Sequence, residues 1–254
     1  MTSLAELLRR KETQYCGWSG LADPLSAEAI GRAGFDTVCL DQQHGFHDYD
    51  SIRTSIRALA AAGKPAIVRV PYDGYPEIGR ALDLGAEGII CPMINNAADA
   101  RRLADRVKFP PVGLRSWGPH GAMMLWGNTK DEYLAGANSR IVSFAMVETR
   151  ESLSNLDDIL STEGIDGVFL GPNDLSISLS GGAQGDPDLG DVWEAAKKIG
   201  AAARKHGKFA AAYANAPKFA RGYVEAGFTL IAGGSDLVFV RTAAEAMLKS
   251  FREA

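Results

Sequence analysis

Eight short apolar runs alternate with amphipathic, helix-like segments, and this order restricts the fold more than any other feature of the chain. The runs lie at residues 15–20, 37–41, 65–70, 88–93, 141–148, 166–171, 208–214 and 228–233. Helical periodicity occurs at 25–33, 51–62, 75–84, 96–107, 151–161, 191–206, 217–226 and 235–253. Such alternation indicates parallel strands joined by right-handed crossovers. Eight units in 254 residues predict a single-domain α/β protein, a (β/α)8 TIM barrel over residues 1–254.

A weak internal repeat supports the count of eight. Before every second run, a glycine stands between a helix end and a strand start, at Gly34, Gly85, Gly164 and Gly227. Glycine suits the left-handed residue that follows many helices. An open, doubly wound sheet is the competing architecture, but eight runs without a GxGxxG turn favour the barrel.

Composition argues against several classes of function. The formal net charge is −4 and no basic cluster contains interleaved aromatics, which argues against nucleic-acid binding. No apolar run approaches the ~18 residues of a membrane-spanning helix, and residues 1–10 predict a short amphipathic helix rather than a signal peptide. Three cysteines, Cys16, Cys39 and Cys91, lie within strand-like runs without CxxC spacing. We therefore expect buried thiols in a reducing cytoplasm and no membrane partner.

Carboxylates follow two of the predicted strands. The fifth run ends in Glu148, and the sixth leads through Gly171, Pro172 and Asn173 into Asp174. The carboxyl ends of parallel barrel strands meet at the rim where such folds place their active sites. Two carboxylates there can hold one hard divalent cation and leave its other positions to water and substrate oxygens. Taken alone, Glu148 could instead cap the helix that follows it, and Asp174 could do the same for the segment after it.

Polar side chains follow the second and third runs as well. Asp41 and His44 come at the end of the second run, and Arg69 lies at the end of the third. An Asp three residues before a His can orient the imidazole for general-base catalysis, and an arginine can neutralise a substrate oxyanion. A loop histidine and a rim salt bridge are the structural alternatives. No lysine ends a strand, so a Schiff-base mechanism lacks a nucleophile.

Several motifs occur in order along nearly the whole chain, and together they resemble one family. They are Gly34-Phe35-Asp36, Asp41-Gln42-Gln43-His44-Gly45, Val68-Arg69-Val70-Pro71, Pro92-Met93, Gly113-Leu114-Arg115-Ser116, Glu148-Thr149-Arg150 and Gly167-Val168-Phe169-Leu170-Gly171-Pro172-Asn173-Asp174-Leu175-Ser176. The chain resembles the HpcH/HpaI aldolases, which are class II, metal-dependent aldolases of the pyruvate type. The Gly-Pro-Asn-Asp-Leu-Ser sequence is the most specific of these motifs.

The resemblance implies a carbon–carbon lyase that enolises pyruvate or a related 2-oxo acid, such as hydroxypyruvate, and adds it reversibly to an aldehyde. Glu148 and Asp174 would bind Mg2+, Mn2+ or Co2+, and no organic cofactor is implied. The cation would chelate the carboxylate and keto oxygen of the substrate. Arg69 would stabilise the enolate. His44, paired with Asp41, would act as acid and base through a metal-bound water.

The resemblance also implies substrate contacts and an assembly. The expected substrate-binding residues are Arg69, Trp18, Gly171, Pro172, Asn173 and Asp174. Backbone amides after Gly171 would hold the substrate carboxylate. Relatives form hexamers that exchange the C-terminal helix between subunits. The apolar side of segment 235–253 is compatible with such a homo-oligomer.

The chain departs from the family pattern in two places. Met146 stands where some relatives have a glutamine, and Met123 and Met124 occupy a region where some relatives carry an arginine. A dicarboxylate semialdehyde would lose a charged anchor there, which makes a short polar hydroxyaldehyde plausible. The stretch 111–140 around these methionines is irregular and rich in Gly, Trp and Met, and we expect a functional loop.

Two other functions stay open. An acyl-CoA lyase of the citryl or malyl type would need a basic site for the CoA phosphates, and stretch 111–140 offers only Arg115, Lys130 and Arg140. The other alternative is a non-catalytic barrel that binds a keto acid as a sensor. The presence of Asp41, His44 and Arg69 together argues against a sensor.

Overall fold

The strands form where the apolar runs predict them. The computed structural model describes residues 2–10 and 12–253. Within these residues, eight parallel strands close into one barrel in chain order, with β1 paired to both β2 and β8. They are β1 Gln14–Ser19, β2 Thr37–Asp41, β3 Ala66–Arg69, β4 Gly88–Cys91, β5 Val142–Val147, β6 Gly167–Leu170, β7 Phe209–Ala214 and β8 Leu230–Gly233. The predicted (β/α)8 barrel is confirmed, and the open sheet is wrong.

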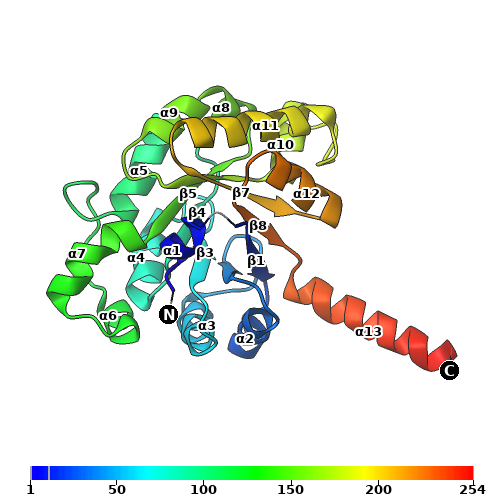
Figure 1. Ribbon diagram of the computed structural model, residues 1–254, viewed down its shortest axis with the longest axis horizontal. Helices are drawn as coiled ribbons and strands as arrows, with labels where there is room; N and C mark the ends of the chain where they lie inside the picture. The colour runs from blue at the N-terminus through cyan, green and yellow to red at the C-terminus, as the bar shows by residue number, and fades with distance from the viewer. Residues whose placement is uncertain (1, 11, 254) are drawn as a thin grey trace.

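Helices surround the barrel and connect successive strands (Figure 1). They are α1 Leu4–Leu8, α2 Pro24–Arg32, α3 Tyr49–Ala61, α4 Tyr75–Leu84, α5 Ala97–Val107, α6 His120–Trp126, α7 Lys130–Arg140, α8 Arg150–Ser154, α9 Leu156–Ser161, α10 Pro172–Leu179, α11 Gly190–Lys205, α12 Pro217–Glu225 and α13 Asp236–Glu253. Gly34, Gly85, Gly164 and Gly227 have φ angles of 114°, 113°, 91° and 96°. The repeated glycines therefore do turn the chain from a helix into the next strand.

Three segments differ from the sequence prediction. Residues 111–140 contain α6 and α7, and α7 begins with a capping box between Thr129 and Glu132. The predicted helix at 151–161 is divided into α8 and α9. Directly after β6, where no helix was predicted, α10 begins with Pro172, whose fixed φ suits the first helical position.

The end of the barrel at which the strands begin is closed by α1. Leu4 is fully buried in the apolar cluster inside the barrel, and its backbone N–H donates to the Glu87 carboxylate at 2.9 Å. Glu87 precedes β4 and also forms an ion pair with Arg140 of α7 at 2.9 Å. Because α1 and α7 lie at this end, the opposite end, where the strands finish, is the one available to a ligand.

The last helix extends away from the barrel, and Figure 1 shows it in red. Its first turn contacts the barrel, where the rings of Phe239 and Phe35 lie 6.1 Å apart. Beyond this contact the helix exposes large apolar side chains, among them Val240, Met247, Leu248 and Phe251.

The cysteines are free and buried, as predicted from their positions in the strand-like runs. Burial raises the pKa of the Cys91 thiol to about 12, which keeps this group protonated near neutral pH. In residues 2–10 and 12–253, no helix is long and apolar enough to cross a membrane.

Candidate active site

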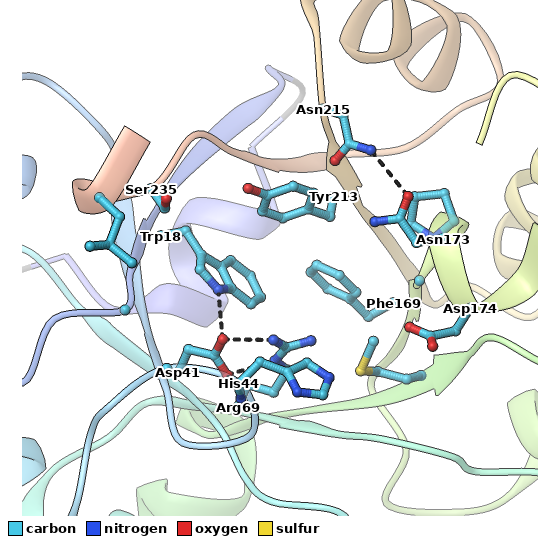
Figure 2. A pocket seen from close by; sticks show the side chains of 16 residues that line it. Trp18, Asp41, His44, Arg69, Phe169, Asn173, Asp174, Tyr213, Asn215 and Ser235 are labelled. Atoms are coloured by element: carbon cyan, nitrogen blue, oxygen red, sulfur yellow. Dashed lines mark hydrogen bonds and ion pairs between the residues drawn. The ribbon is translucent and has the colours of Figure 1, made fainter. Parts of the chain in front are cut away.

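A cavity of ≈ 380 Å3 lies at the carboxyl ends of the strands (Figure 2). It is lined by Trp18, Gly20, Asp41, His44, Gly45, Arg69, Met146, Phe169, Gly171, Pro172, Asn173, Asp174, Tyr213, Asn215, Ser235 and Leu237. Every predicted site residue lines this cavity except Glu148. The Glu148 side chain is buried directly behind Gly171, which forms part of the wall. The structure therefore brings the predicted residues together at the expected rim.

The Asp41 carboxylate and the Arg69 guanidinium form a two-point ion pair. Strands β2 and β3 pair in a register that sets Asp41 beside Arg69. Arg69 Nε donates to Asp41 Oδ1 at 2.8 Å, and Arg69 Nη2 donates to Asp41 Oδ2 at 2.7 Å. The indole Nε1 of Trp18 donates to the same Oδ2 at 3.2 Å, and the guanidinium lies 5.0 Å from the centre of the Trp18 ring. Trp18 and Asp41 thus fix the position and orientation of the arginine.

This ion pair controls the charge of Asp41. Burial opposes ionisation of the carboxyl, but the hydrogen bonds and the positive charge of Arg69 outweigh burial, with a further contribution from Trp18. The pKa of Asp41 is therefore held below its usual range, and the residue stays an anion near neutral pH.

The predicted pairing of Asp41 with the His44 ring differs from the structure. Asp41 Oδ1 accepts hydrogen bonds from the backbone N–H groups of Gln43 and His44, at 3.0 and 3.3 Å. Within the described residues, the His44 imidazole donates no hydrogen bond to Asp41, because Arg69 and Trp18 occupy that carboxylate. The His44 side chain is exposed at the cavity instead. Asp41 thus anchors the loop that carries His44 and leaves the ring free.

Glu148 is a buried carboxylate that follows β5. Its Oε1 accepts a hydrogen bond from the backbone N–H of Met93 at 2.7 Å. Met93 has a φ of 56°, a conformation that residues other than glycine rarely adopt, and it aims its amide at this oxygen. Burial outweighs the Met93 hydrogen bond and, together with the negative charge of Asp174, raises the pKa of Glu148 to about 7. Two carboxylates that repel each other in this way favour a cation.

Gly171 keeps one oxygen of Glu148 accessible. A Cβ atom at position 171 would lie 2.6 Å from Glu148 Oε2, and this oxygen accepts no hydrogen bond from the described residues. Asp174, exposed in the first turn of α10, supplies a second set of carboxylate oxygens. No group of three or more His, Cys, Asp or Glu suited to a metal occurs in the described part of the chain, so two carboxylates are the expected protein donors. Hard oxygen donors with room beside them fit a divalent cation.

The far side of the cavity is formed by residues that were not among the predicted site residues. Figure 2 shows Tyr213, Asn215 and Ser235 across the cavity from Asp41 and Arg69. Asn215 Nδ2 donates to Asn173 Oδ1 at 3.2 Å, and the Tyr213 ring packs edge-on against Trp18 with centroids 5.2 Å apart. These residues follow or lie near the ends of β7 and β8, so the strand-end rule that found the carboxylates could have found them too.

A buried carboxylate connects α13 to the loop after β1. Asp236 is 2 % exposed and accepts hydrogen bonds from the backbone N–H groups of Gly20 and Leu21, at 2.9 and 3.0 Å. The hydroxyls of Ser19 and Ser26 also donate to it, at 3.1 and 3.0 Å. Because Gly20, Ser235 and Leu237 line the cavity, Asp236 fixes this part of the rim.

None of the residues that line the cavity comes from stretch 111–140. That stretch begins beyond α5, and its helix α7 contacts α1 at the opposite end of the barrel. Arg115 is buried there, with Nη2 donating to Asp83 at 2.8 Å. The expectation of a functional loop at this position has no counterpart in the cavity of this chain.

Comparisons with known proteins identify the family of this chain. Residues 14–243 match the HpcH/HpaI aldolase/citrate lyase family. A hydroxypyruvate/pyruvate aldolase from Rhizorhabdus wittichii is 36 % identical over 236 residues, which cover 93 % of each chain. A 5-keto-4-deoxy-D-glucarate aldolase from Escherichia coli is 33 % identical over 246 residues, 97 % of this chain and 95 % of the relative.

A solved structure extends the likeness to the fold. The HpcH/HpaI aldolase/citrate lyase family protein from Burkholderia cenocepacia superimposes with a TM-score of 0.88 at 32 % identity, over 99 % of this chain and 100 % of the other. Family membership implies a divalent cation and small-molecule substrates of the keto-acid and aldehyde types. The chain belongs to the HpcH/HpaI aldolase/citrate lyase family and is an aldolase, an enzyme that makes or breaks a carbon–carbon bond.

Proposed function

We propose that this chain is a divalent-metal-dependent aldolase that enolises pyruvate or hydroxypyruvate and adds the enolised carbon reversibly to an aldehyde. One observation carries the proposal: Asp174, Arg69 and His44 line a single cavity, and the Glu148 carboxylate lies directly behind its wall at Gly171. The name of the R. wittichii relative supports this choice of keto acids.

We assign Glu148 and Asp174 as the residues that would hold Mg2+, Mn2+ or Co2+. When bound, the cation supplies Lewis-acid polarisation of the keto oxygen. The first turn of α10 contributes backbone N–H groups, because the first intrahelical bond there is donated by Leu175 to Gly171 at 3.0 Å. The N–H groups of Asn173 and Asp174 precede that bond and suit the carboxylate of a keto acid.

Arg69 stabilises the charge that develops on the keto oxygen. Asp41 binds its Nε and Nη2, so the guanidinium is held in one orientation before the substrate arrives. A preorganised cation in a partly buried site stabilises an oxyanion without reorganising during the reaction.

His44 moves the proton. Its exposed ring is free of Asp41 and lies at the cavity, where it can take a proton from C3 of the keto acid and return one in the reverse direction. The hydrogen bond from the His44 backbone N–H to Asp41 holds its loop in place.

The proposal extends to the state of the protein in the cell. We infer the hexamer that the resemblance implies, with the apolar side of α13 packed on neighbouring subunits. The exposure of Val240, Met247, Leu248 and Phe251 in the single chain supports association through this helix. We also place the protein in the cytoplasm, a compartment whose reducing conditions suit its three free cysteines.

Deuterium uptake into pyruvate in D2O, followed by NMR, tests the function because it reports enolisation without any aldehyde. The wild type should exchange C3 protons, lose exchange in EDTA and regain it with Mg2+, Mn2+ or Co2+. His44→Ala should slow exchange by about 10²–10⁴-fold, the usual size of a general acid–base contribution, while Mn2+ binding persists.

His120→Ala is the matched control, because His120 is exposed on α6, outside the cavity. It should exchange at the wild-type rate. Full wild-type exchange in EDTA would refute metal dependence, and absence of exchange under all conditions would favour an acyl-CoA lyase or a non-catalytic barrel.

A further inference from the structure

The two sides of the cavity differ in charge. The residues assigned to the keto acid, Arg69, His44 and Asp174, lie together with buried Glu148 on one side. A cavity of ≈ 380 Å3 is within the range of complete small-molecule sites, so the remaining space is available to the second reactant.

That remaining space is lined by uncharged polar groups. Tyr213, Asn215 and Ser235 line it together with the apolar Leu237, and Figure 2 shows the first three on the side away from Arg69. Of the sixteen described residues that line the cavity, only Arg69 and His44 can carry positive charge, and Asp41 already binds Arg69.

The amide pair of Asn173 and Asn215 has groups left for a ligand. Asn215 Nδ2 donates to Asn173 Oδ1 at 3.2 Å. Within the described residues, Asn215 Oδ1 accepts no hydrogen bond and Asn173 Nδ2 donates none. One free acceptor and one free donor match a hydroxyl group, which can both donate and accept.

A fixed negative charge lies behind the same side. Asp236 adjoins Ser235 and Leu237, and every described donor to its carboxylate is an uncharged hydroxyl or backbone N–H. An anionic group on the second reactant would lose water, face this charge and find no cation of the lining to pair with.

We propose that Asn215, with Asn173, Tyr213 and Ser235, forms the binding subsite for the acceptor, and that this acceptor is an uncharged hydroxyaldehyde. The inference rests on the proposed function and specifies its second substrate. The keto-acid C3 loses a proton to His44 and forms a carbon–carbon bond to the aldehyde carbon, and the aldehyde oxygen gains a proton. Atoms balance as a one-to-one addition, and the new subsite holds the aldehyde hydroxyls during this step.

Aldehydes that differ in hydroxyl groups or in charge test the subsite. With pyruvate as donor, the wild type should use glyceraldehyde with kcat/KM at least about 10-fold above that for propanal, which lacks the hydroxyls, and for glyoxylate, which carries a carboxylate. A preference for glyoxylate would overturn the proposed charge class.

Asn215→Leu replaces the amide by an apolar side chain of similar size. It should raise KM for glyceraldehyde by about 10-fold and change KM for propanal by less than about 2-fold. Asn215→Ser, which keeps a polar group, should give a smaller rise and serves if the leucine variant does not fold. Asn215→Arg should improve the use of glyoxylate. Asn128→Leu, at a position away from the cavity, is the matched control and should leave both aldehydes unchanged.

Deuterium exchange into pyruvate distinguishes a failure of the proposed function from a failure of the acceptor subsite. Absence of exchange in the wild type refutes the proposed function itself. Normal exchange, with glyceraldehyde and propanal affected equally by Asn215→Leu, refutes only the acceptor subsite. Loss of exchange in Asn215→Leu would assign Asn215 to the keto-acid side and overturn the inference.

Discussion

Asp41 accepts five hydrogen bonds from three parts of the barrel rim, and this makes it the organising side chain of the site. Its donors are the Trp18 indole, two nitrogens of Arg69, and the backbone N–H groups of Gln43 and His44. One carboxylate therefore sets both the orientation of the arginine and the position of the histidine loop. Changes at Asp41 and Arg69 should act on the same catalytic feature.

Arg69→Lys keeps the positive charge but loses the planar fork that binds Asp41 at two points. We expect kcat to fall by about 10²–10³-fold, the scale of losing one oxyanion donor, while the protein stays folded. Steady-state kinetics and circular dichroism check this result. An unchanged kcat would make Arg69 a structural rim residue.

Asp41→Asn should reduce kcat by an amount similar to Arg69→Lys, because an amide cannot accept both arginine bonds as a carboxylate does. The double variant should lose little more than either single variant, since the two residues act as one unit. Asp50→Asn, at an exposed ion pair with Arg53, is the control. Additive losses in the double variant would show that Asp41 acts through His44 instead.

His47 makes the free energy of unfolding depend on pH. Burial lowers its pKa, and the carboxylates of Asp236, Asp41 and Asp48 raise it by less. The unfolded chain, with a histidine pKa of ~6.5, then binds more protons than the folded one in mildly acidic solution, so the free energy of unfolding falls as pH drops below that value. Urea unfolding at pH 5 and pH 7.5 should show a smaller pH difference for His47→Gln than for wild type. His120→Gln should leave the difference unchanged, and an equal slope in all three proteins would refute the assignment.

The turn between β6 and α10 leaves the Glu148 carboxylate accessible because residue 171 is a glycine and has no side chain. A Cβ at Gly171 would also lie 3.1 Å from Glu148 Cβ and from Met146 Cε, so the side chains behind the turn have little room to move. We expect Gly171→Ala to weaken Mn2+ binding by about 10–100-fold, the range seen when residues that support metal ligands are changed. Isothermal titration with Mn2+ measures this effect.

Gly136→Ala in α7 is the matched control, since a Cβ there meets no atom within 4 Å. Its Mn2+ affinity should equal that of the wild type. Equal affinity in Gly171→Ala would show that Glu148 Oε2 is not a metal donor.

Strand positions could be predicted because the signal for a buried parallel strand is local in the sequence. Short apolar runs between glycines and amphipathic segments define each unit without knowledge of its neighbours. The position of α10 could not be predicted in the same way, because Gly171, Pro172 and Asn173 are turn-forming residues. In the folded chain, Pro172 begins a helix instead.

The pairing of side chains was harder to predict than the elements that carry them. Asp41 is three residues from His44 and 28 residues from Arg69, and closeness in sequence favoured the histidine. The register between β2 and β3 instead places Arg69 beside Asp41, so the arginine forms the ion pair. Asn215 and Ser235 were missed for a different reason: they follow strands as the carboxylates do, but Asn and Ser at such positions also read as ordinary turn residues.

For the whole molecule, the exposed side of α13 predicts association. Leu248 and Phe251 are 49 % and 72 % exposed, and large apolar groups at the surface of a helix favour burial against another chain. The double change Leu248→Asp and Phe251→Asp should lower the mass measured by light scattering to that of smaller assemblies. Lys249→Asp, which alters charge on the same turn without removing apolar surface, should keep the wild-type mass. An unchanged mass in the double variant would exclude α13 from the interface.

Asp236 also determines how motion of α13 reaches the active site. The helix has 18 residues, so it is ~27 Å long, and its first residue is held to the barrel by buried hydrogen bonds. A sideways shift of ~3 Å at the free end corresponds to a rotation of about 6° and moves Leu237, ~1.5 Å from the fulcrum, by only ~0.2 Å. Movement at the free end of α13 therefore barely reaches the cavity, and in the proposed hexamer neighbouring subunits can shift against each other while the rim keeps its shape.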